Sequence, residues 1–348
     1  MANFHQIDLM ARGAAIALFL LWSWILLRDH RNILSARLAV AMNAGIIGYV
    51  LATLSWNYDP SPVRVACSIV AGSTPGLFWL FARTWFNDRQ HLERWAVLIV
   101  ALSVVNIIVM QVVFQRNEGA GIFFGTVFRV GMFAFAAAGL WEAWRGREGD
   151  LVEIRRRMRP RIAAAVGISV ILIAIVEIAV YSMHAPIWIA RSVGGGIAIL
   201  TLLFCTAMFG MRENDLFGAP PKALAIAAPP LDEAMTERLF MHMNAELPHR
   251  DEEMTVAKLA AQLGVQEYRL RRHINGSLGH RNFAAFLNGY RLAEVKSALA
   301  DPSQKEVPII TIALDAGFGS LGPFNRAFRE AEAMTPSAYR VLHSANSV

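Results

Sequence analysis

Long apolar runs fill the first two thirds of the chain, and mixed apolar and polar positions follow in the last third. Each run is close to the ~20 residues that an α-helix needs to cross the hydrocarbon core of a bilayer. The seven expected spanning helices are about Leu9–Leu27, Leu38–Ser55, Val63–Phe86, Trp95–Phe114, Ile122–Trp144, Arg161–Met183 and Ile187–Gly210. The first run is not typical of a cleaved signal peptide, because its positive charges, Arg28 and Arg31, follow the apolar stretch. The pattern predicts an all-α membrane domain over residues 1–210.

Arginines concentrate in the odd-numbered connections between these runs. The first connection carries three, the third two and the fifth seven, whereas the second and fourth carry one each and the sixth none. Because cytoplasmic loops hold an excess of Lys and Arg, the odd-numbered connections should be cytoplasmic. The N-terminus is then outside, and seven crossings of a bacterial inner membrane leave the C-terminus in the cytoplasm. The run Arg155–Arg161 in the fifth connection could bind anionic lipid or nucleic acid, but a topology anchor is the commoner role.

Glycine and proline mark two special points inside the expected spans. Pro75, between Gly72 and Gly76, predicts a kink in the third span. The run Gly194–Gly196 favours close packing of the seventh span against another helix, and the alternative is a soft point in that helix.

A linker and an amphipathic helix separate the membrane part from the last third. Residues 211–230 contain four prolines among alanines, which prevents a continuous helix. Over residues 231–250, apolar residues recur every four positions, as in an amphipathic helix. They are Leu231, Met235, Leu239, Met243 and Leu247. This helix could couple the two parts, dimerise the protein, or pack on the domain behind it.

The last third contains two pairs of short helices, and a glycine joins each pair. In the first pair an apolar face precedes Gly264, and the second helix is expected from near Gln266. In the second pair the turn is at Gly317, and Ser320 can N-cap a helix that starts near Leu321. The inward-facing residues are Val256, Leu259, Ala260 and Leu263 in the first pair, and Ile309, Ile312, Ala313, Ala316, Phe324, Ala327 and Phe328 in the second. Such pairs are typical of a helix-turn-helix, whose second helix can enter a DNA major groove.

Composition agrees with a chain that is mostly in a membrane. Of 348 residues, 55% are hydrophobic and only 17% are charged, which is too apolar for a soluble regulator. The two cysteines, Cys67 and Cys205, fall near opposite membrane faces, so no disulfide is expected. No Cys/His cluster suggests a metal site, and no cofactor is expected.

The stretch IALDAGFGSLGPFNRAFRE, followed by TPSAYR, closely resembles the C-terminal signature of the AraC/XylS family of bacterial transcription regulators. The resemblance extends over residues 251–348 and does not include the membrane part. It implies a cytoplasmic domain with two helix-turn-helix motifs, joined by the helix Phe283–Leu299, that binds double-stranded promoter DNA. The implied recognition helices are about Glu267–Asn275 and Leu321–Glu330.

The resemblance also implies which side chains reach DNA. These are Tyr268, Arg271 and Arg272, with Arg269 beside them, on the first recognition helix, and Asn325 and Arg326 on the second. Arginine suits guanine because its planar fork can donate to O6 and N7 together. In the alternative reading, Tyr268 packs inside the domain, and Arg269 or Arg272 is only solvated.

Two features depart from the family pattern. The second recognition helix opens with Leu321, Gly322 and Pro323, which offer little to a base edge. Ala333 stands where glycine is usual, which removes an easy left-handed cap. From Arg250 to His343 there are 12 Lys/Arg and 10 Asp/Glu, a net charge of +2, so sequence-independent attraction to phosphates should be modest.

Ionisable residues within the expected spans are candidates for a sensor site. Arg129, Glu177 and Arg191 each lie roughly 6–10 Å below the outer surface, at ~1.5 Å of rise per residue. His184 lies near the rim of this site. The four residues could receive a small-molecule or protein signal. Alternatively, Glu177 and Arg191 form a structural pair, and Arg129 extends to the headgroups.

We therefore expect a membrane-bound transcription regulator and not an enzyme. The expected partners are promoter DNA, membrane lipid, an unknown signal and a second copy of the chain. One alternative is a transporter or membrane enzyme with an appended regulator, although the spans contain no HExxH pair, paired carboxylates or nucleotide-binding loop. Another is a bundle that only anchors or dimerises the DNA-binding part.

Overall fold

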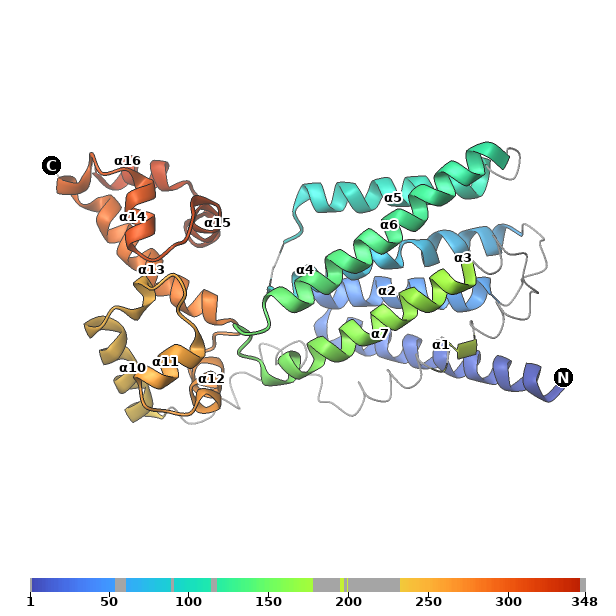
Figure 1. The fold of residues 1–348 in the computed structure, drawn as a ribbon, viewed down its shortest axis with the longest axis horizontal. Helices are drawn as coiled ribbons and strands as arrows, with labels where there is room; N and C mark the ends of the chain where they lie inside the picture. The colour runs from blue at the N-terminus through green and yellow to red at the C-terminus, as the bar shows by residue number, and fades with distance from the viewer. Residues whose placement is uncertain are drawn as a thin grey trace. The chain divides into compact units, whose positions relative to one another are not determined.

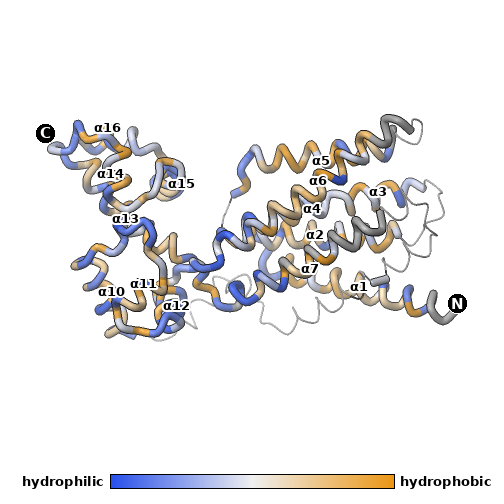
Figure 2. The backbone as a smooth tube through the Cα atoms, in the orientation of Figure 1, coloured by the Kyte–Doolittle hydropathy of each residue, from blue (hydrophilic) through white to orange (hydrophobic). Residues whose placement is uncertain are grey.

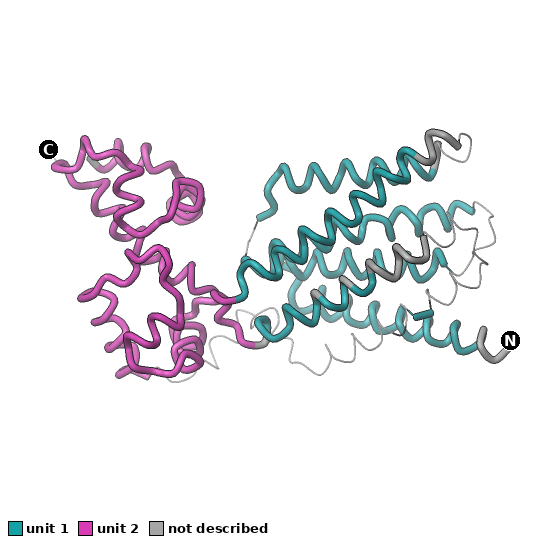
Figure 3. The backbone as a smooth tube through the Cα atoms, in the orientation of Figure 1, with its two compact units in different colours: residues 1–147, 154–224 teal, residues 148–153, 225–348 magenta. Residues whose placement is uncertain are grey.

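The computed structural model describes residues 2–53, 61–88, 91–113, 118–177, 195, 196, 199 and 232–344. Within these residues the secondary structure is helical apart from one isolated β-bridge, which confirms the all-α class. The chain divides into two compact units (Figure 3). The first unit comprises residues 1–147 and 154–224, and the second comprises residues 148–153 and 225–348. A short segment between two apolar helices thus belongs to the C-terminal unit, which the hydropathy pattern did not predict.

The first unit consists of long apolar helices that run alongside one another (Figure 1). They are α1 (Ala2–His30), α2 (Leu34–Ala52), α3 (Pro62–Gly72), α4 (Thr74–Trp85), α5 (Arg94–Val113), α6 (Glu118–Arg145) and α7 (Glu153–Glu177). Among the described residues, five helical stretches are long and apolar enough to cross a membrane, and they match the first five expected spans. The sixth expected span falls partly on α7. The seventh lies outside the described residues except for Gly195, Gly196 and Ile199.

The third span is interrupted where the sequence predicts a kink. Helix α3 ends at Gly72 and α4 begins at Thr74, with Ser73 between them. Proline explains the interruption, because Pro75 has no backbone N–H and its ring collides with the preceding turn of a continuous helix. The bend separates α3 from α4, the helix at the centre of the unit.

Helix α4 packs against α2, α5 and α6. The buried aromatic residues of α4 are Phe78, Trp79, Phe81 and Trp85, and Phe86, which follows the helix, is buried beside them. The close approach of α6 to α4 depends on a small residue on α6, Gly139. A Cβ added at Gly139 would lie only 2.7 Å from Cδ1 of Phe78. Small residues at such contacts are typical of helix packing in membranes.

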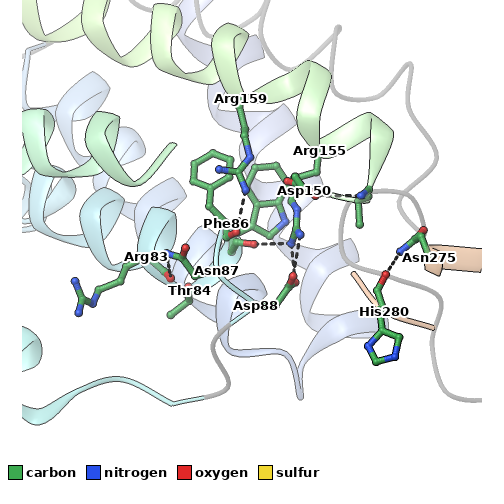
Figure 4. A network of polar contacts seen from close by, with 12 residues as sticks. Arg83, Thr84, Phe86, Asn87, Asp88, Asp150, Arg155, Arg159, Asn275 and His280 are labelled. Carbon is green, nitrogen blue, oxygen red and sulfur yellow. Dashed lines mark hydrogen bonds and ion pairs between the residues drawn. The ribbon is translucent and has the colours of Figure 1, made fainter. Parts of the chain in front are cut away.

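The arginine run Arg155–Arg161 belongs to a helix and not to a connecting loop, because α7 already begins at Glu153. Arg155 forms two bonds with Asp88, of 2.6 and 2.8 Å, and donates to the carbonyl oxygen of Trp85 at 2.8 Å (Figure 4). Arg159 donates to the carbonyl oxygens of Phe86 and Ala143, at 2.9 and 3.0 Å. Both arginines are buried, and they satisfy carbonyl groups near the C-terminal ends of α4 and α6. The sequence suggested that this run binds lipid or nucleic acid, or anchors the topology. It did not predict that these arginines cap the ends of two helices.

The second unit contains α10 (Glu233–Ala245), η3 (Pro248–Arg250), α11 (Val256–Gln262), α12 (Glu267–Gly276), α13 (Phe283–Ala300), η4 (Pro302–Gln304), α14 (Ile309–Asp315), α15 (Leu321–Glu332) and α16 (Pro336–Ser344). It has two hydrophobic cores, one around α11 and α12 and one around α14 and α15, and α13 contributes to both. Helix α10 has the predicted amphipathic pattern. Its residues Leu239 and Met243 are buried in the first core, so this helix packs on the domain behind it.

Candidate nucleic-acid interface and membrane polar sites

The first helix pair is built from α11 and α12. The Thr255 side chain caps α11 by accepting from the backbone N–H of Lys258 at 3.2 Å. Gly264 then takes a left-handed conformation, with φ +61°, which glycine adopts without a steric penalty. On α12, Leu270 and Ile274 are fully buried, four residues apart. This burial sets which face of α12 points to solvent.

The second pair, α14 and α15, repeats this construction. Its turn glycine, Gly317, has φ +93°. On α15, Phe324 and Phe328 are fully buried, again four residues apart. Ser320 takes the N-cap position, as predicted, but its hydroxyl makes no capping hydrogen bond. Ala333, the C-cap residue of α15, is left-handed with φ 55°, so alanine occupies a conformation that favours glycine.

The shared four-residue spacing of the buried residues relates the sequence positions of α12 to those of α15. Leu270 and Ile274 then correspond to Phe324 and Phe328. In this register Arg272 corresponds to Arg326, and both side chains are exposed. The second helix of each pair thus exposes an arginine two residues after a fully buried residue.

The six predicted DNA-binding residues are not equally accessible. Tyr268 is 63% exposed, and Arg269, Arg272 and Arg326 are also exposed. Asn325 is half-buried. Arg271 is buried, with only 8% of its surface exposed, so this structure does not present it to DNA.

Arg271 is held by backbone carbonyl groups from a distant part of the chain. Its Nη1 donates to the carbonyl oxygen of Asp150 at 2.8 Å, and its Nη2 donates to that of Glu148 at 2.7 Å. Its Nε donates to Glu267 one turn earlier on α12, at 2.7 Å. Sequence reasoning missed this arrangement, because nothing in the local pattern pairs residues 121 positions apart.

A junction around η3 connects the two helix pairs. Arg291 of α13 donates to the carbonyl oxygens of His249 and Asp251, at 2.7 and 2.9 Å. Gly317 lies against the same segment, where a Cβ would be 2.8 Å from Cα of Arg250. The turn of the second pair is therefore seated on a segment that α13 also holds. DNA binding by two helices requires such a constant spacing between them.

The side chain of Glu294 adds charge to this junction. It accepts from Nε2 of His249 at 2.9 Å and pairs with Arg250 at 2.7 Å. Burial disfavours the carboxylate, but the hydrogen bonds from Arg250 and His249 outweigh it and lower the pKa of Glu294. The carboxylate thus stays ionised and ties η3 to α13.

The predicted sensor residues are only partly described. Arg129 lies on α6, partly exposed, and its Nη2 donates to Oγ1 of Thr126 at 3.3 Å. Glu177 is the last residue of α7. His184 and Arg191 lie outside the described residues.

Asp8 and Arg12 form a partly buried ion pair on α1 that the hydropathy pattern did not single out. Nε of Arg12 lies 3.0 Å from Oδ2 of Asp8, and the Arg12 side chain is 2% exposed. Its Nη1 donates to Oγ1 of Thr53 at 2.6 Å and to the carbonyl oxygen of Val50 at 3.0 Å. Gly195 lies against this pair, since a Cβ there would be 3.6 Å from Cγ of Asp8. An arginine inside an apolar run, four residues after a carboxylate, is the signal that could have revealed it.

Comparison with known proteins finds a family match that lies within the C-terminal unit. A family model described as a helix-turn-helix domain matches residues 259–341. The Right origin-binding protein of Escherichia coli (strain K12) is 33% identical over 92 residues, which are 26% of this chain and 30% of that protein. Transcriptional regulator Rob of Salmonella typhimurium is 32% identical over 92 residues, with the same shares. The chain thus covers less than a third of the length of these relatives. No solved structure matches the chain significantly. These similarities support DNA-binding transcription regulation by the C-terminal unit.

Proposed function

We propose that this protein is a membrane-bound bacterial transcription regulator whose C-terminal unit is an AraC-type domain that binds promoter DNA through two helix-turn-helix motifs. The observation that carries the proposal is the repeated construction of the two helix pairs. In each pair a left-handed glycine precedes a second helix, and that helix exposes an arginine at an equivalent position, Arg272 or Arg326. One such pair is common in proteins, whereas a repeated pair with matched exposed arginines favours two contacts with DNA.

The exposed side chains suit the chemistry of a major groove. The guanidinium groups of Arg272 and Arg326 can each donate two hydrogen bonds to O6 and N7 of a guanine. Arg269 and Tyr268 lie one helical turn earlier than Arg272 and suit phosphates or base edges. Asn325 is half-buried, so it can contact DNA only where the DNA lies close to the surface of α15.

The surface of the first unit favours a membrane location. Figure 2 shows hydrophobic residues along its helices. On α5, Leu98 and Leu102 are each 59% exposed, and Val105 is 53% exposed. Contiguous exposed apolar surface of this kind is unfavourable in water and suits contact with lipid chains. We propose the inner membrane, with the N-terminus outside and the C-terminal unit in the cytoplasm, from the arginine bias of the connections.

The first unit is proposed to sense a signal at its outer end. Ionisable groups within a membrane domain are costly and usually functional. The described groups are Arg129 and the Asp8–Arg12 pair, and Glu177, His184 and Arg191 complete the proposed set. Glu177→Gln and Arg191→Gln should change reporter output without changing membrane abundance. Normal switching in both variants would show that these charges are structural.

The experiment that tests DNA binding is genome-wide mapping of the DNA bound by the full-length protein in its native host. Arg272→Ala and Arg326→Ala should each abolish or redistribute the enriched fragments. Lys305→Ala is the matched control, because it also removes one exposed positive charge but lies outside both helix pairs. Fragments that persist unchanged in both arginine variants would refute the assignment of α12 and α15.

A further inference from the structure

Residues Glu148–Glu153 connect α6 and α7, which are helices of the first unit. The segment itself nevertheless belongs to the second, C-terminal unit. The geometry points to a clamp. Residues Glu148–Glu153, named the clamp segment here, keep Arg271 from contacting DNA until a change in α6 or α7 releases it. The inference rests on the proposed DNA-binding function, and it adds how that function is controlled.

Backbone pairing attaches the clamp segment to the C-terminal unit. Asp150 and Asn282 form an antiparallel β-bridge. On either side of it, the Leu151 N–H donates to the carbonyl oxygen of Arg281 at 3.1 Å, and the Phe283 N–H donates to that of Gly149 at 2.9 Å. The segment is thus paired with the residues that lead into α13.

Leu151 anchors the same segment by its side chain. It is 2% exposed and belongs to the hydrophobic core formed around α11 and α12. The neighbouring Asp150 is fully buried, and its side chain accepts from the Val152 N–H at 3.0 Å, which shapes the turn. The segment is therefore docked by backbone and side chain together, and is not a loop that passes over the surface.

The clamp occupies the donors that Arg271 would need for a base. Its Nη1 and Nη2 both donate to backbone carbonyl oxygens of the segment, and its Nε donates to Glu267. A bidentate contact with guanine needs two of these nitrogens on one edge of the guanidinium group. Arg271 cannot make that contact while the segment is in place, whereas its neighbour Arg272 is exposed.

The clamp segment is directly continuous with two helices of the membrane unit. Seven residues separate the end of α6 at Arg145 from the start of α7 at Glu153. Two residues after Glu153, Arg155 is held by Asp88 and the carbonyl oxygen of Trp85. The connection is short, so a shift of α6 or α7 can be transmitted along the chain to the carbonyl groups that hold Arg271.

A reversible cross-link tests the clamp in the full-length protein. The Asp150–Asn282 pair is flanked by hydrogen bonds on both sides, which is the non-hydrogen-bonded type of antiparallel pair, with its Cβ atoms close together. Asp150→Cys with Asn282→Cys, in a Cys67→Ser, Cys205→Ser background, should form a disulfide that keeps the segment docked. The probe is a short duplex from the most enriched genomic fragment, and a scrambled duplex is the reference.

The double-cysteine protein also carries Leu151→Pro, which removes the N–H that donates to Arg281 and so releases the segment when the cysteines are reduced. We expect oxidation to dock the segment again and to lower affinity for the specific duplex about tenfold, since one bidentate base contact is lost, and a reductant to restore it. Both samples carry the same substitutions, so any effect of Asn282→Cys on folding is common to them. The background protein with Asp150 and Asn282 intact should not respond to oxidant. Equal affinity of the oxidised and reduced forms would overturn the clamp.

A second variant acts in the opposite direction. Leu151→Pro removes both the buried side chain and the N–H that donates to Arg281. It should tighten specific binding, and Arg271→Ala should then cost more affinity than it does with the wild-type segment. Weaker binding by a folded Leu151→Pro protein would mean that the segment only braces the domain, which also overturns the clamp. If no form of the protein prefers the specific duplex over the scrambled one, the proposed function itself fails.

Discussion

Gly317 lies against the backbone of Arg250, and a Cβ on this glycine would sit 2.8 Å from Cα of Arg250. It is also left-handed, with φ +93°. The turn of the second helix pair can therefore be seated on η3 only with a glycine at this position. The contact connects two segments of the C-terminal unit that are far apart in sequence, and it keeps α15 in place relative to α12.

Gly317→Ala should destabilise the C-terminal unit far more than Gly264→Ala. Both glycines are left-handed, and alanine costs about 1–2 kcal/mol in that conformation. At Gly264 the nearest atom to a Cβ is Nη2 of Arg238 at 3.7 Å, so no collision adds to this cost. Hydrogen–deuterium exchange of α14 and α15 in the full-length proteins measures the difference. Equal protection in the two variants would contradict the seating of Gly317 on η3.

Ala333→Gly should stabilise the protein by roughly 0.5–1 kcal/mol, because glycine removes left-handed strain worth about 1–2 kcal/mol and loses part of that gain to unfolded-chain entropy. Ala331→Gly is the matched control two residues earlier, inside α15, and it should destabilise by about 0.5–1 kcal/mol. Thermal unfolding of both variants gives the comparison. A loss of stability in Ala333→Gly would show that the left-handed cap is not strained.

Arg272→Ala and Arg326→Ala should each cost roughly 1–3 kcal/mol of specific DNA binding if each arginine contacts a guanine. Arg269→Ala serves as a contrast: a phosphate contact weakens binding to all sequences alike and reduces the salt slope by about one. Band-shift titrations on specific and scrambled duplexes at several salt concentrations separate the two cases. Equal losses on both duplexes for Arg272→Ala would assign that residue to phosphate.

Acidification should weaken the packing of α10 on α12. His273 is buried, with Nε2 3.1 Å from Oγ1 of Thr236, and burial lowers its pKa below the ordinary 6.5. At pH values between that lowered pKa and 6.5, His273 binds a proton in the unfolded chain but not in the folded protein. Stability is therefore complete above about pH 6.5 and falls as the pH drops toward the folded pKa.

His273→Gln should flatten this dependence, measured as the thermal midpoint between about pH 7.5 and pH 5. The dependence will not vanish, because burial also lowers the pKa of His280. His242→Gln, which replaces a partly exposed histidine on α10, is the matched control substitution. A His273→Gln profile that matches wild type would exclude His273 as the titrating group.

The membrane topology is tested by reporter fusions after His184 and after Pro230. The arginine bias places the first outside and the second in the cytoplasm. A reporter active only in the cytoplasm should thus work at Pro230 and fail at His184, and a periplasmic reporter should show the reverse. Finding both sites on one side would exclude seven crossings with this orientation.

Much of the local structure could be read from the sequence, because it depends on periodicity and on single residues. Apolar runs predicted the long helices α1 to α6, and Pro75 predicted the break between α3 and α4. The apolar positions Phe324, Ala327 and Phe328 predicted α15, and the turn glycines Gly264 and Gly317 marked where each helix pair bends. Such features need only near neighbours in the chain, so one sequence suffices to locate them.

Only the tertiary structure decided which charged side chains are free. Arg271 and Arg272 are adjacent and chemically identical. Arg271 donates hydrogen bonds to the carbonyl oxygens of Glu148 and Asp150, whereas Arg272 is exposed. Arg155 is likewise buried and paired with Asp88, although it lies in a run that the sequence suggested as a topology anchor or a site for lipid or nucleic acid. Backbone carbonyls are present at every residue and carry no side-chain signature, so which of them reaches a given arginine follows from the fold alone.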